Sequence, residues 1–234
     1  GIESELVFVK SEGDIDLVTP LYEMGVQGIF TRTLDIALLK DEIDIAVHYM
    51  KDVPTILPKG IVQTAVLPRG KHQDILVLND NLIGNVCTKS IGSVDDQSHL
   101  KKNLLIATSS IRRKAQWLHR FPYHSLDSLR GNVNTRIQKL NDSNWNGAIF
   151  AYAGLDRIGI LPPNFCILDW MLPAPAQGAV VVVANENDKE AVACTALIND
   201  AATALSVKIE RDFLRELLGG CTTPISAYVQ VVDE

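Results

Sequence analysis

Strand-length apolar runs alternate with helical patterns over roughly the first 200 residues of this sequence, and few fold classes accommodate that order. One run, Val180–Val183, is typical of a strand that is covered on both faces. Alternation of this kind predicts an α/β protein with mostly parallel sheets. The expected strands are Leu6–Val9, Ile43–Met50, Leu104–Ala107, Ala148–Tyr152 and Ala179–Ala184, and Leu34–Leu39 is expected to be helical.

Two segments that contain Pro and Gly interrupt the pattern at Pro68–His72 and Pro173–Gly178. We expect both to cross between two lobes, and two crossings between α/β lobes would enclose a cleft. Beyond residue 200, the apolar spacing from Leu205 to Phe213 predicts a helix that ends at Gly219. Ile225–Val232 is expected to form a strand.

The composition narrows the class of protein. The chain of 234 residues has a net charge of −6 and 47% hydrophobic residues, which is enough for a sizeable core. No apolar run approaches the roughly 20 residues of a membrane span, and no signal region is apparent. The four cysteines are widely spaced and lack metal-binding patterns, so we expect a reduced, cytoplasmic protein without a metal site. We also expect a monomer that binds neither membrane nor nucleic acid.

Positive charge is concentrated in one stretch of this acidic chain. Residues 108–140 sum to about +6, so the remaining residues sum to about −12. This contrast predicts a site for a ligand with several negative charges. The residues alone leave open a solvated helix face and an RNA-binding surface. Five of the ten arginines lie in this stretch: Arg112, Arg113, Arg120, Arg130 and Arg136.

A helix is expected to begin inside the arginine stretch. Thr108–Ser110 offers N-cap residues, and Ile111, Ala115 and Leu118 share one helix face. The pair Arg112–Arg113 then falls in the first turn, where cations oppose the helix dipole. An anion bound at that end would turn this unfavourable interaction with the dipole into a favourable site, because backbone N–H groups and guanidinium donors would converge on the anion.

Polar segments follow several of the expected strands, at the strand ends where open α/β sheets bind ligands. Asp52 is the only acid in the segment His48–Pro54 and would face the arginine lobe across a cleft. A carboxylate in that setting can stabilise a cation or transfer a proton. The alternative is an exposed turn aspartate that bonds to nearby backbone. His48 is expected to be a packed strand residue.

Cys221 follows two glycines at the end of a helix. This placement suits an accessible thiol used for covalent attachment, although an inert thiol is the alternative. Cys87, Cys166 and Cys194 have no comparable setting.

Six segments of the sequence together resemble the porphobilinogen deaminase family, also called hydroxymethylbilane synthases. They occur in the family's order and at nearly its spacing. Any one of them is a weak signal, but six in register are highly specific. The segments are Asp44–Pro54, Thr108–Arg113, Arg130–Arg136, Ala153–Leu155, Gln177–Ala179 and Gly219–Ile225.

The resemblance implies a transferase of tetrapyrrole and haem biosynthesis. Such an enzyme joins four porphobilinogen molecules head to tail into hydroxymethylbilane and releases ammonia at each step. It also implies a dipyrromethane cofactor, attached through a thioether to the cysteine that matches Cys221. The expected partners are porphobilinogen and the growing linear pyrrole chain, whose carboxylates the arginine stretch would bind.

The resemblance also implies roles for individual residues. Asp52 would be catalytic, because its carboxylate would bond pyrrole N–H groups, stabilise developing positive charge and assist proton transfer. Besides Cys221, the expected cofactor-binding residues are Lys51, Ser109, Arg112, Arg113, Arg130, Gly131 and Asn132. The residues expected to bind substrate are Thr108, Arg136, Arg157 and Gln177.

Three domains are implied by the family fold. Domain one would comprise residues 1–68 with 176–199, and domain two residues 69–175. These two would resemble the lobes of periplasmic binding proteins. Residues 200–234 would form a small and here incomplete α+β third domain, which carries the cofactor cysteine on a loop.

The sequence departs from the family pattern in several places. It starts after the family's first strand and stops within the third domain, so an inactive fragment of the enzyme is one alternative. A non-catalytic, two-lobed anion-binding module is another. Gln27 and Thr33 replace charged residues, although Arg32 restores a cation nearby. Tyr49 stands where a serine is usual, and it would narrow the cleft or pack beneath it.

Overall fold

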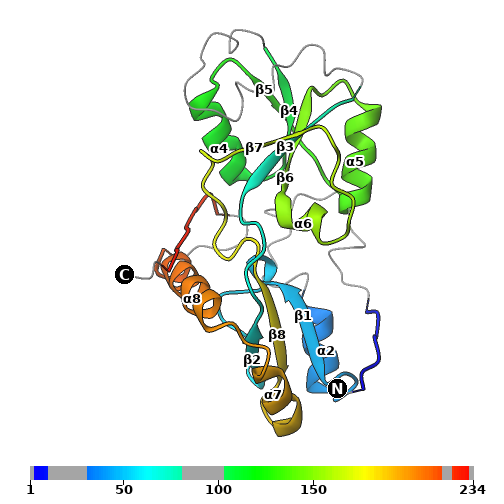
Figure 1. Cartoon of the computed structure of the whole chain (residues 1–234), viewed down its shortest axis with the longest axis vertical. Coiled ribbons are helices and arrows are strands. Elements are labelled where there is room, and N and C mark those ends of the chain that lie inside the picture. Colours follow the sequence, from blue (N-terminus) through cyan, green and yellow to red (C-terminus); the bar gives the residue numbers. More distant parts are fainter. Residues whose placement is uncertain (1–2, 10–30, 81–102, 218–222, 232–234) are drawn as a thin grey trace.

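The computed structural model describes residues 3–9, 31–80, 103–217 and 223–231. Figure 1 shows two bodies along the long axis, one with a five-stranded sheet above and one with a three-stranded sheet below. We call them the upper body and the lower body. Gln27 and Cys221 lie outside the described residues, so the predictions for them stay predictions.

The lower body is built on one central strand with a neighbour on each side. Val181 to Ala184 of that central strand are buried, as the valine run predicts. The core joins Leu38 and Val207 from two helices to Val181 and Val183. The strand order is β1 (Ile45–Tyr49), β8 (Val180–Asn185) and β2 (Ile61–Val66). The helices are α2 (Arg32–Leu39), α7 (Lys189–Ala196) and α8 (Ala201–Glu216).

The upper body is a sheet with helices on both faces. Trp117 of α4 packs in the core on one face, and Leu140 of α5 packs in the core on the other. The strand order is β5 (Ser125–Asp127), β4 (Leu105–Ala107), β6 (Gly147–Ala151), β3 (Asp74–Leu78) and β7 (Phe165–Ile167). The helices are α4 (Ile111–Arg120), α5 (Val133–Asp142) and the short α6 (Tyr152–Asp156).

The α/β class is confirmed, but the expectation of mostly parallel sheets is wrong for the described strands. β8 runs antiparallel to β1 and β2, and β3 runs antiparallel to β6 and β7. Parallel pairing among these strands is confined to β4 with its neighbours β5 and β6. The cause is the connectivity, because β3 and β8 each arrive from the opposite body. They run away from the junction between the bodies, whereas their neighbours run toward it.

The two segments expected to cross between lobes do link the two sheets, and they pack against each other. Gly70 N donates a hydrogen bond to Gly178 O at 3.0 Å. Gly178 has a φ of 88°, and a Cβ there would lie 2.9 Å from Gly70 O. Glycine therefore permits both the backbone conformation and the close approach of the two crossings.

One buried carboxylate on α8 ties both crossings together. Glu210 is fully buried and accepts hydrogen bonds from Nη1 and Nη2 of Arg69, at 2.6 and 3.1 Å. It also accepts from Ala176 N at 2.7 Å. Arg69 belongs to the first crossing and Ala176 to the second, so α8 is fixed to both connections between the bodies.

Two expected strands do not form. Leu6–Val9 is irregular, and Leu6 and Phe8 are 75% and 88% exposed. Residues 225–231 form no strand either, and side chains hold this segment instead. Val229 N donates to Glu210 Oε1 at 2.8 Å, and the Tyr228 ring stacks on His72 at 3.9 Å. Apolar composition does not make a strand without a neighbour that takes up its backbone hydrogen bonds.

The helices that the spacing predicts are present at Arg32–Leu39 and within Ala201–Glu216. Across the described ranges, no single helix is long and apolar enough to cross a membrane. α7 and α8 reach the required length and composition only when taken together, and this pair is bent by 109°.

Candidate active site

A cavity of about 290 Å³ lies between the two bodies, lined by residues from the ends of β1 and β6 and from the start of α5. Its size is close to the lower limit of about 300 Å³ for small-molecule sites. A larger cavity of about 440 Å³ between α8 and the lower sheet contains none of the predicted site residues. The smaller cavity brings together eight of them: Lys51, Asp52, Arg113, Arg130, Gly131, Asn132, Arg136 and Gln177.

Asp52 reaches the cavity from a short 3-10 turn, η1 (Met50–Asp52), that follows β1. Met50 N donates to Ala179 O at 3.1 Å, and Val53 N donates to Met50 O at 3.2 Å, so the turn is fixed at both ends. Burial raises the pKa of Asp52, although Lys51 and Arg136 act in the opposite direction. Burial lowers the pKa of Lys51, and Asp52 opposes this change. A charged ligand in the cavity would therefore change the ionisation of both Lys51 and Asp52.

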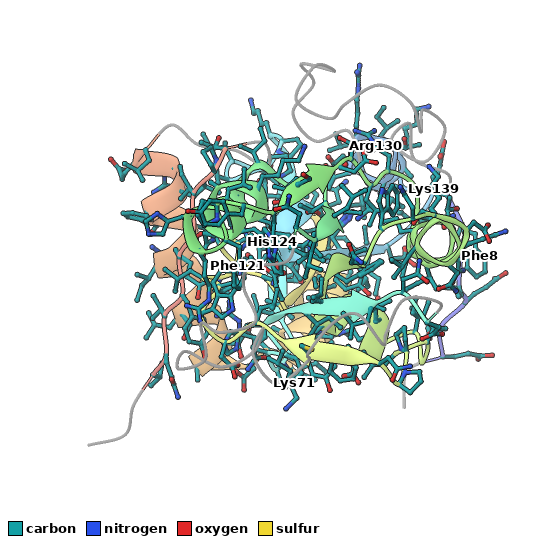
Figure 2. All side chains as sticks on the ribbon, turned by 90° about the horizontal axis from the view of Figure 1, so that it is seen from above. Phe8, Lys71, Phe121, His124, Arg130 and Lys139 are labelled. Carbon is teal, nitrogen blue, oxygen red and sulfur yellow. The ribbon has the colours of Figure 1, made fainter. Side chains whose placement is uncertain are left out.

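The opposite wall of the cavity comes from the loop before α5 and its first turn. Asn132 caps the helix, accepting a hydrogen bond from Thr135 N at 2.9 Å. Arg136 Nε donates to Gly131 O at 2.6 Å, and burial lowers the pKa of Arg136. Lys139 Nζ donates to Arg130 O at 3.1 Å, and Figure 2 shows these two residues close together. Arg130 therefore reaches the cavity from a loop that side chains of α5 stabilise, and Arg136 reaches it from the helix itself.

Arg112 and Arg113 share one buried partner, Asp74 at the start of β3. Oδ2 of Asp74 accepts from Arg112 Nη2 at 2.6 Å, and Oδ1 accepts from Arg113 Nη2 at 2.7 Å. Arg113 Nη1 also donates to Ile149 O at 3.0 Å, and Arg112 Nη1 donates to Leu172 O. Burial alone would raise the pKa of Asp74, but Arg113 and Arg112 outweigh it and lower that pKa to about 2. The carboxylate is therefore ionised at neutral pH.

The buried face of α4 is not the one that Ile111, Ala115 and Leu118 indicate, since all three are exposed. Ile111 and Leu118 are 38% and 40% exposed, whereas Arg112 and Arg113 are 5% and 7% exposed. Ser110 is the N-cap, accepting from Arg113 N at 3.4 Å. The solvated-face alternative is therefore wrong for these two arginines. The anion that offsets two cations in the first turn is an internal one, Asp74.

Gln177 connects this ion-pair network to the cavity. Its Nε2 donates to Asp74 Oδ1 at 2.9 Å and to His72 O at 2.7 Å, and the residue lines the cavity. Because Gln177 lies in the second crossing, the arginine cluster and the connection between the bodies share one hydrogen-bond network.

Four of the predicted residues do not line the cavity: Thr108, Ser109, Arg112 and Arg157. Ser109 Oγ donates to Leu129 O and accepts from Leu129 N, both at 2.9 Å, next to Arg130. Thr108 is buried, and its Oγ1 accepts from Ser110 N at 3.3 Å. Arg157 Nη2 donates to Gly178 O at 2.7 Å, and its guanidinium lies 5.5 Å from the centre of the Tyr49 ring.

The structure also places Arg32, from the segment that departs from the family pattern, and His48, which was expected to pack in a strand. Arg32 lines a separate cavity with Asp35 and Pro54, so it does not replace a cation in the central cavity. His48 is 9% exposed, which confirms the packed strand residue.

Asp74 is the main residue that the sequence reasoning missed. A usable signal was present, because Asp74 opens a run of four apolar residues, Ile75–Leu78, and a carboxylate at a buried strand needs a cationic partner. Glu210 gave no such signal, since charged residues are common on an amphipathic helix.

A family model described as "Porphobilinogen deaminase, dipyromethane cofactor binding domain" matches residues 1–193. Porphobilinogen deaminase of Syntrophotalea carbinolica is 37% identical over 236 residues, covering 100% of this chain and 71% of that protein. The chloroplastic porphobilinogen deaminase of Pisum sativum is 38% identical over 227 residues, covering 96% of this chain and 58% of that protein. The chain thus spans less than two thirds of the plant relative's length.

Similarity to solved structures is lower. Full-length CbnR complexed with its target DNA is 9% identical with a TM-score of 0.44, covering 71% of this chain and 55% of that one. The substrate-binding protein AbpA of Streptococcus pneumoniae, bound to L-arginine, is 16% identical with a TM-score of 0.36, covering 80% and 68%. The family match and the relatives decide the assignment, and the chain belongs to the porphobilinogen deaminase family.

Proposed function

We propose that the protein joins porphobilinogen molecules head to tail into hydroxymethylbilane, with Asp52 as the catalytic group. The observation that carries this proposal is a single cavity in which Asp52 shares the lining with Arg113, Arg130 and Arg136. A substrate with a basic aminomethyl group and two carboxylates needs both kinds of contact. Anion binding alone would not require an acid in the same cavity.

The donor set of the cavity fits the dipyrromethane cofactor that the family model names. Lys51, Arg113, Arg130 and Arg136 supply cations for its carboxylate side chains, and Asp52 supplies an acceptor for pyrrole N–H groups. When bound, the cofactor provides the pyrrole carbon to which the first substrate is joined. Its attachment to Cys221 is part of the proposal.

Arg113 can bind a ligand even though it is paired with Asp74. A guanidinium has about five N–H donors, and the bonds from Nε, Nη1 and Nη2 use one donor on each nitrogen. One N–H on each of Nη1 and Nη2 is left for a carboxylate in the cavity. Asp74 fixes the plane of the guanidinium, which reduces the entropy lost when a ligand binds.

In this proposal, some of the other predicted residues bind the ligand directly and others act through a neighbouring residue. Gly131, Asn132 and Gln177 line the cavity and would bind directly. Arg112, Thr108 and Ser109 would act through Arg113 and the loop that carries Arg130. Arg157 would reach the substrate chain only after leaving the Tyr49 ring.

Asp52 would act electrostatically and as a proton carrier. Loss of ammonia from the aminomethyl carbon leaves positive charge on the substrate, which a nearby carboxylate stabilises most where water is excluded. The raised pKa of Asp52 also brings the carboxyl closer to neutral pH, where proton transfer is more efficient.

The remaining expectations belong to the same proposal. Domain one would comprise residues 1–68 with 176–199, domain two 69–175 and a partial third domain 200–234. The first two would be lobes like those of periplasmic binding proteins, and the separate sheets of the upper and lower bodies support this division. We further propose a cytoplasmic monomer that binds neither nucleic acid nor membrane.

Intact mass combined with ammonia release tests the function. The mass of the purified protein should exceed that of its chain by two linked pyrrole units, and Cys221→Ser should lack this addition. Cys194→Ser is the matched control and should keep it. An unmodified Cys221 together with no ammonia release from porphobilinogen would favour the anion-binding module. Steeply salt-dependent binding of RNA without porphobilinogen binding would favour the RNA-binding alternative.

A further inference from the structure

Arg211 of α8 binds the backbone of the segment that carries Asp52. Its Nη1 donates to Met50 O and to Val53 O, both at 3.0 Å, and its Nη2 donates to Pro54 O at 2.5 Å. These carbonyls flank Lys51 and Asp52 on both sides. A single guanidinium therefore holds the start and the end of the turn from which Asp52 reaches the cavity.

The contact is possible because a guanidinium is planar and presents a fork of donors. Three carbonyl oxygens within five residues cannot all be satisfied by the turn itself, which contains one internal bond, Val53 N to Met50 O at 3.2 Å. With its carbonyls turned toward α8, the segment lies between Arg211 on one side and the cavity on the other. Arg211 does not line the cavity, so it cannot touch a ligand there.

The position of Arg211 is itself fixed by its neighbour in sequence. Glu210 binds Arg69 in the first crossing and Ala176 in the second. It also accepts from Val229 N at 2.8 Å. The same turn of α8 is thus anchored to the connections between the bodies, to the segment that follows the helix, and to the Asp52 turn.

We propose that Arg211 is a positioning residue for Asp52, holding the turn so that the carboxylate faces the arginines of the cavity. This inference rests on the proposed function for its effect on turnover, but the effect on the turn itself does not depend on that function.

Arg215 provides a matched control. It lies one turn further along α8, it is also an arginine, and it forms an ion pair with Asp212 on the same helix, at 2.9 Å. Arg211→Gln and Arg215→Gln therefore remove the same charge from the same helix. Only the first removes bonds to the Asp52 turn. Arg211→Lys keeps the charge but replaces the planar fork, whose donors lie on two nitrogens, with one ammonium nitrogen, which fits the three carbonyls less well.

The test measures amide hydrogen exchange at Val53, the titration of the Asp52 carboxyl by carbon NMR, and steady-state kinetics with porphobilinogen, on the full chain. In Arg211→Gln, Val53 should exchange about tenfold faster or more. The titration midpoint of Asp52 should fall toward its usual range, because a looser turn is more hydrated. Lys51, Arg113, Arg130 and Arg136 line the same cavity as Asp52 and remain unchanged. Turnover should fall about tenfold or more while KM changes about twofold or less.

Arg215→Gln should match the wild type in all three measurements, and Arg211→Lys should give intermediate values. If amide exchange at Val53 and the titration midpoint of Asp52 are the same in Arg211→Gln as in the wild type, the proposal is overturned. Equal changes of these two quantities in Arg215→Gln would also overturn it. If Arg211→Gln does not fold, Arg211→Lys decides by the same criteria. Altered exchange and titration in a protein whose wild type does not consume porphobilinogen would support the positioning role and refute the proposed function.

Discussion

Asp74 holds Arg113 through one oxygen, since Oδ1 accepts hydrogen bonds from Nε at 3.1 Å and from Nη2 at 2.7 Å. The side chain of Asp74 is fully buried, and that of Arg113 is 9% exposed. Removing the charge of Asp74 leaves two buried guanidinium groups without an anion. We therefore expect Asp74→Asn to lower the free energy of unfolding by about 3–5 kcal/mol in urea denaturation.

Asp80 is the control for that substitution, because it lies just after the other end of the same strand and is exposed. Asp80→Asn should change the free energy of unfolding by less than about 0.5 kcal/mol. Equal effects of the two substitutions would show that the ion-pair network does not stabilise the fold.

The low pKa of Asp74 also predicts how stability depends on pH. The pKa of about 2 in the folded protein lies below the usual 3.8, so the unfolded chain binds the proton more readily. The contribution of Asp74 is complete above about pH 4 and is lost as the pH falls through 2, and it amounts to about 2 kcal/mol. Carbon NMR of the Asp74 carboxyl should show only about one tenth of the molecules protonated at pH 3. A midpoint near 3.8 would contradict the network.

Sequence reasoning succeeded where local pattern and local chemistry agree. The valine run at Val180–Val183 predicts a covered central strand, because no other element buries four β-branched residues in succession so easily. The segment His48–Pro54 was singled out because Asp52 is its only acid and it follows an expected strand, and Asp52 does line the cavity. Neither inference requires knowledge of what lies across the molecule.

The predictions that were wrong share one physical cause. In each case the structure depends on a contact with residues that are distant in the sequence. The directions of β3 and β8 depend on which body each strand comes from, and apolar spacing carries no direction. The buried face of α4 is set by Asp74, which lies 38 residues before Arg112, so the apolar Ile111 and Leu118 gave the wrong face. Leu6–Val9 has strand composition, but no neighbour pairs with it in the described structure.

Gly178 is expected to tolerate no side chain. Its φ of 88° disfavours any L residue, and a Cβ would lie 2.9 Å from Gly70 O and 3.0 Å from Lys71 O, both backbone atoms. Gly178→Ala should lower the free energy of unfolding by about 1–3 kcal/mol, measured by urea denaturation. Gly154→Ala is the control, because a Cβ on Gly154 meets nothing within 4 Å, and it should be neutral or slightly stabilising. Similar losses in both variants would contradict the close packing of the two crossings.

Tyr49 and Arg157 should be energetically coupled. The guanidinium lies 5.5 Å from the ring centre, so the cation–π attraction joins β1 of the lower body to the end of α6 in the upper body. A double-mutant cycle with Tyr49→Ser and Arg157→Gln should give a coupling free energy of about 0.5–1 kcal/mol. Tyr49→Phe keeps the ring and should keep the coupling. Strict additivity of the Tyr49→Ser and Arg157→Gln effects would rule out an energetic contact.

The raised pKa of Asp52 predicts the acidic limb of the pH profile. Catalysis needs the carboxylate, so kcat should fall as the pH drops toward the pKa of Asp52, at a pH above the usual 3.8. The profile of kcat between about pH 4 and 8 checks this direction. A kcat that stays constant down to about pH 4 would contradict a raised pKa of Asp52 during turnover.

Asp52→Asn tests the central claim most directly, by the rate of ammonia release from porphobilinogen under saturating substrate. The asparagine keeps the size and one acceptor oxygen but cannot stabilise positive charge, so the rate should fall about 100-fold or more with an unchanged mass on Cys221. Asp44→Asn, an exposed acid just before β1, should retain the wild-type rate. A rate within about twofold of wild type in Asp52→Asn would contradict the assignment of Asp52 as the catalytic group.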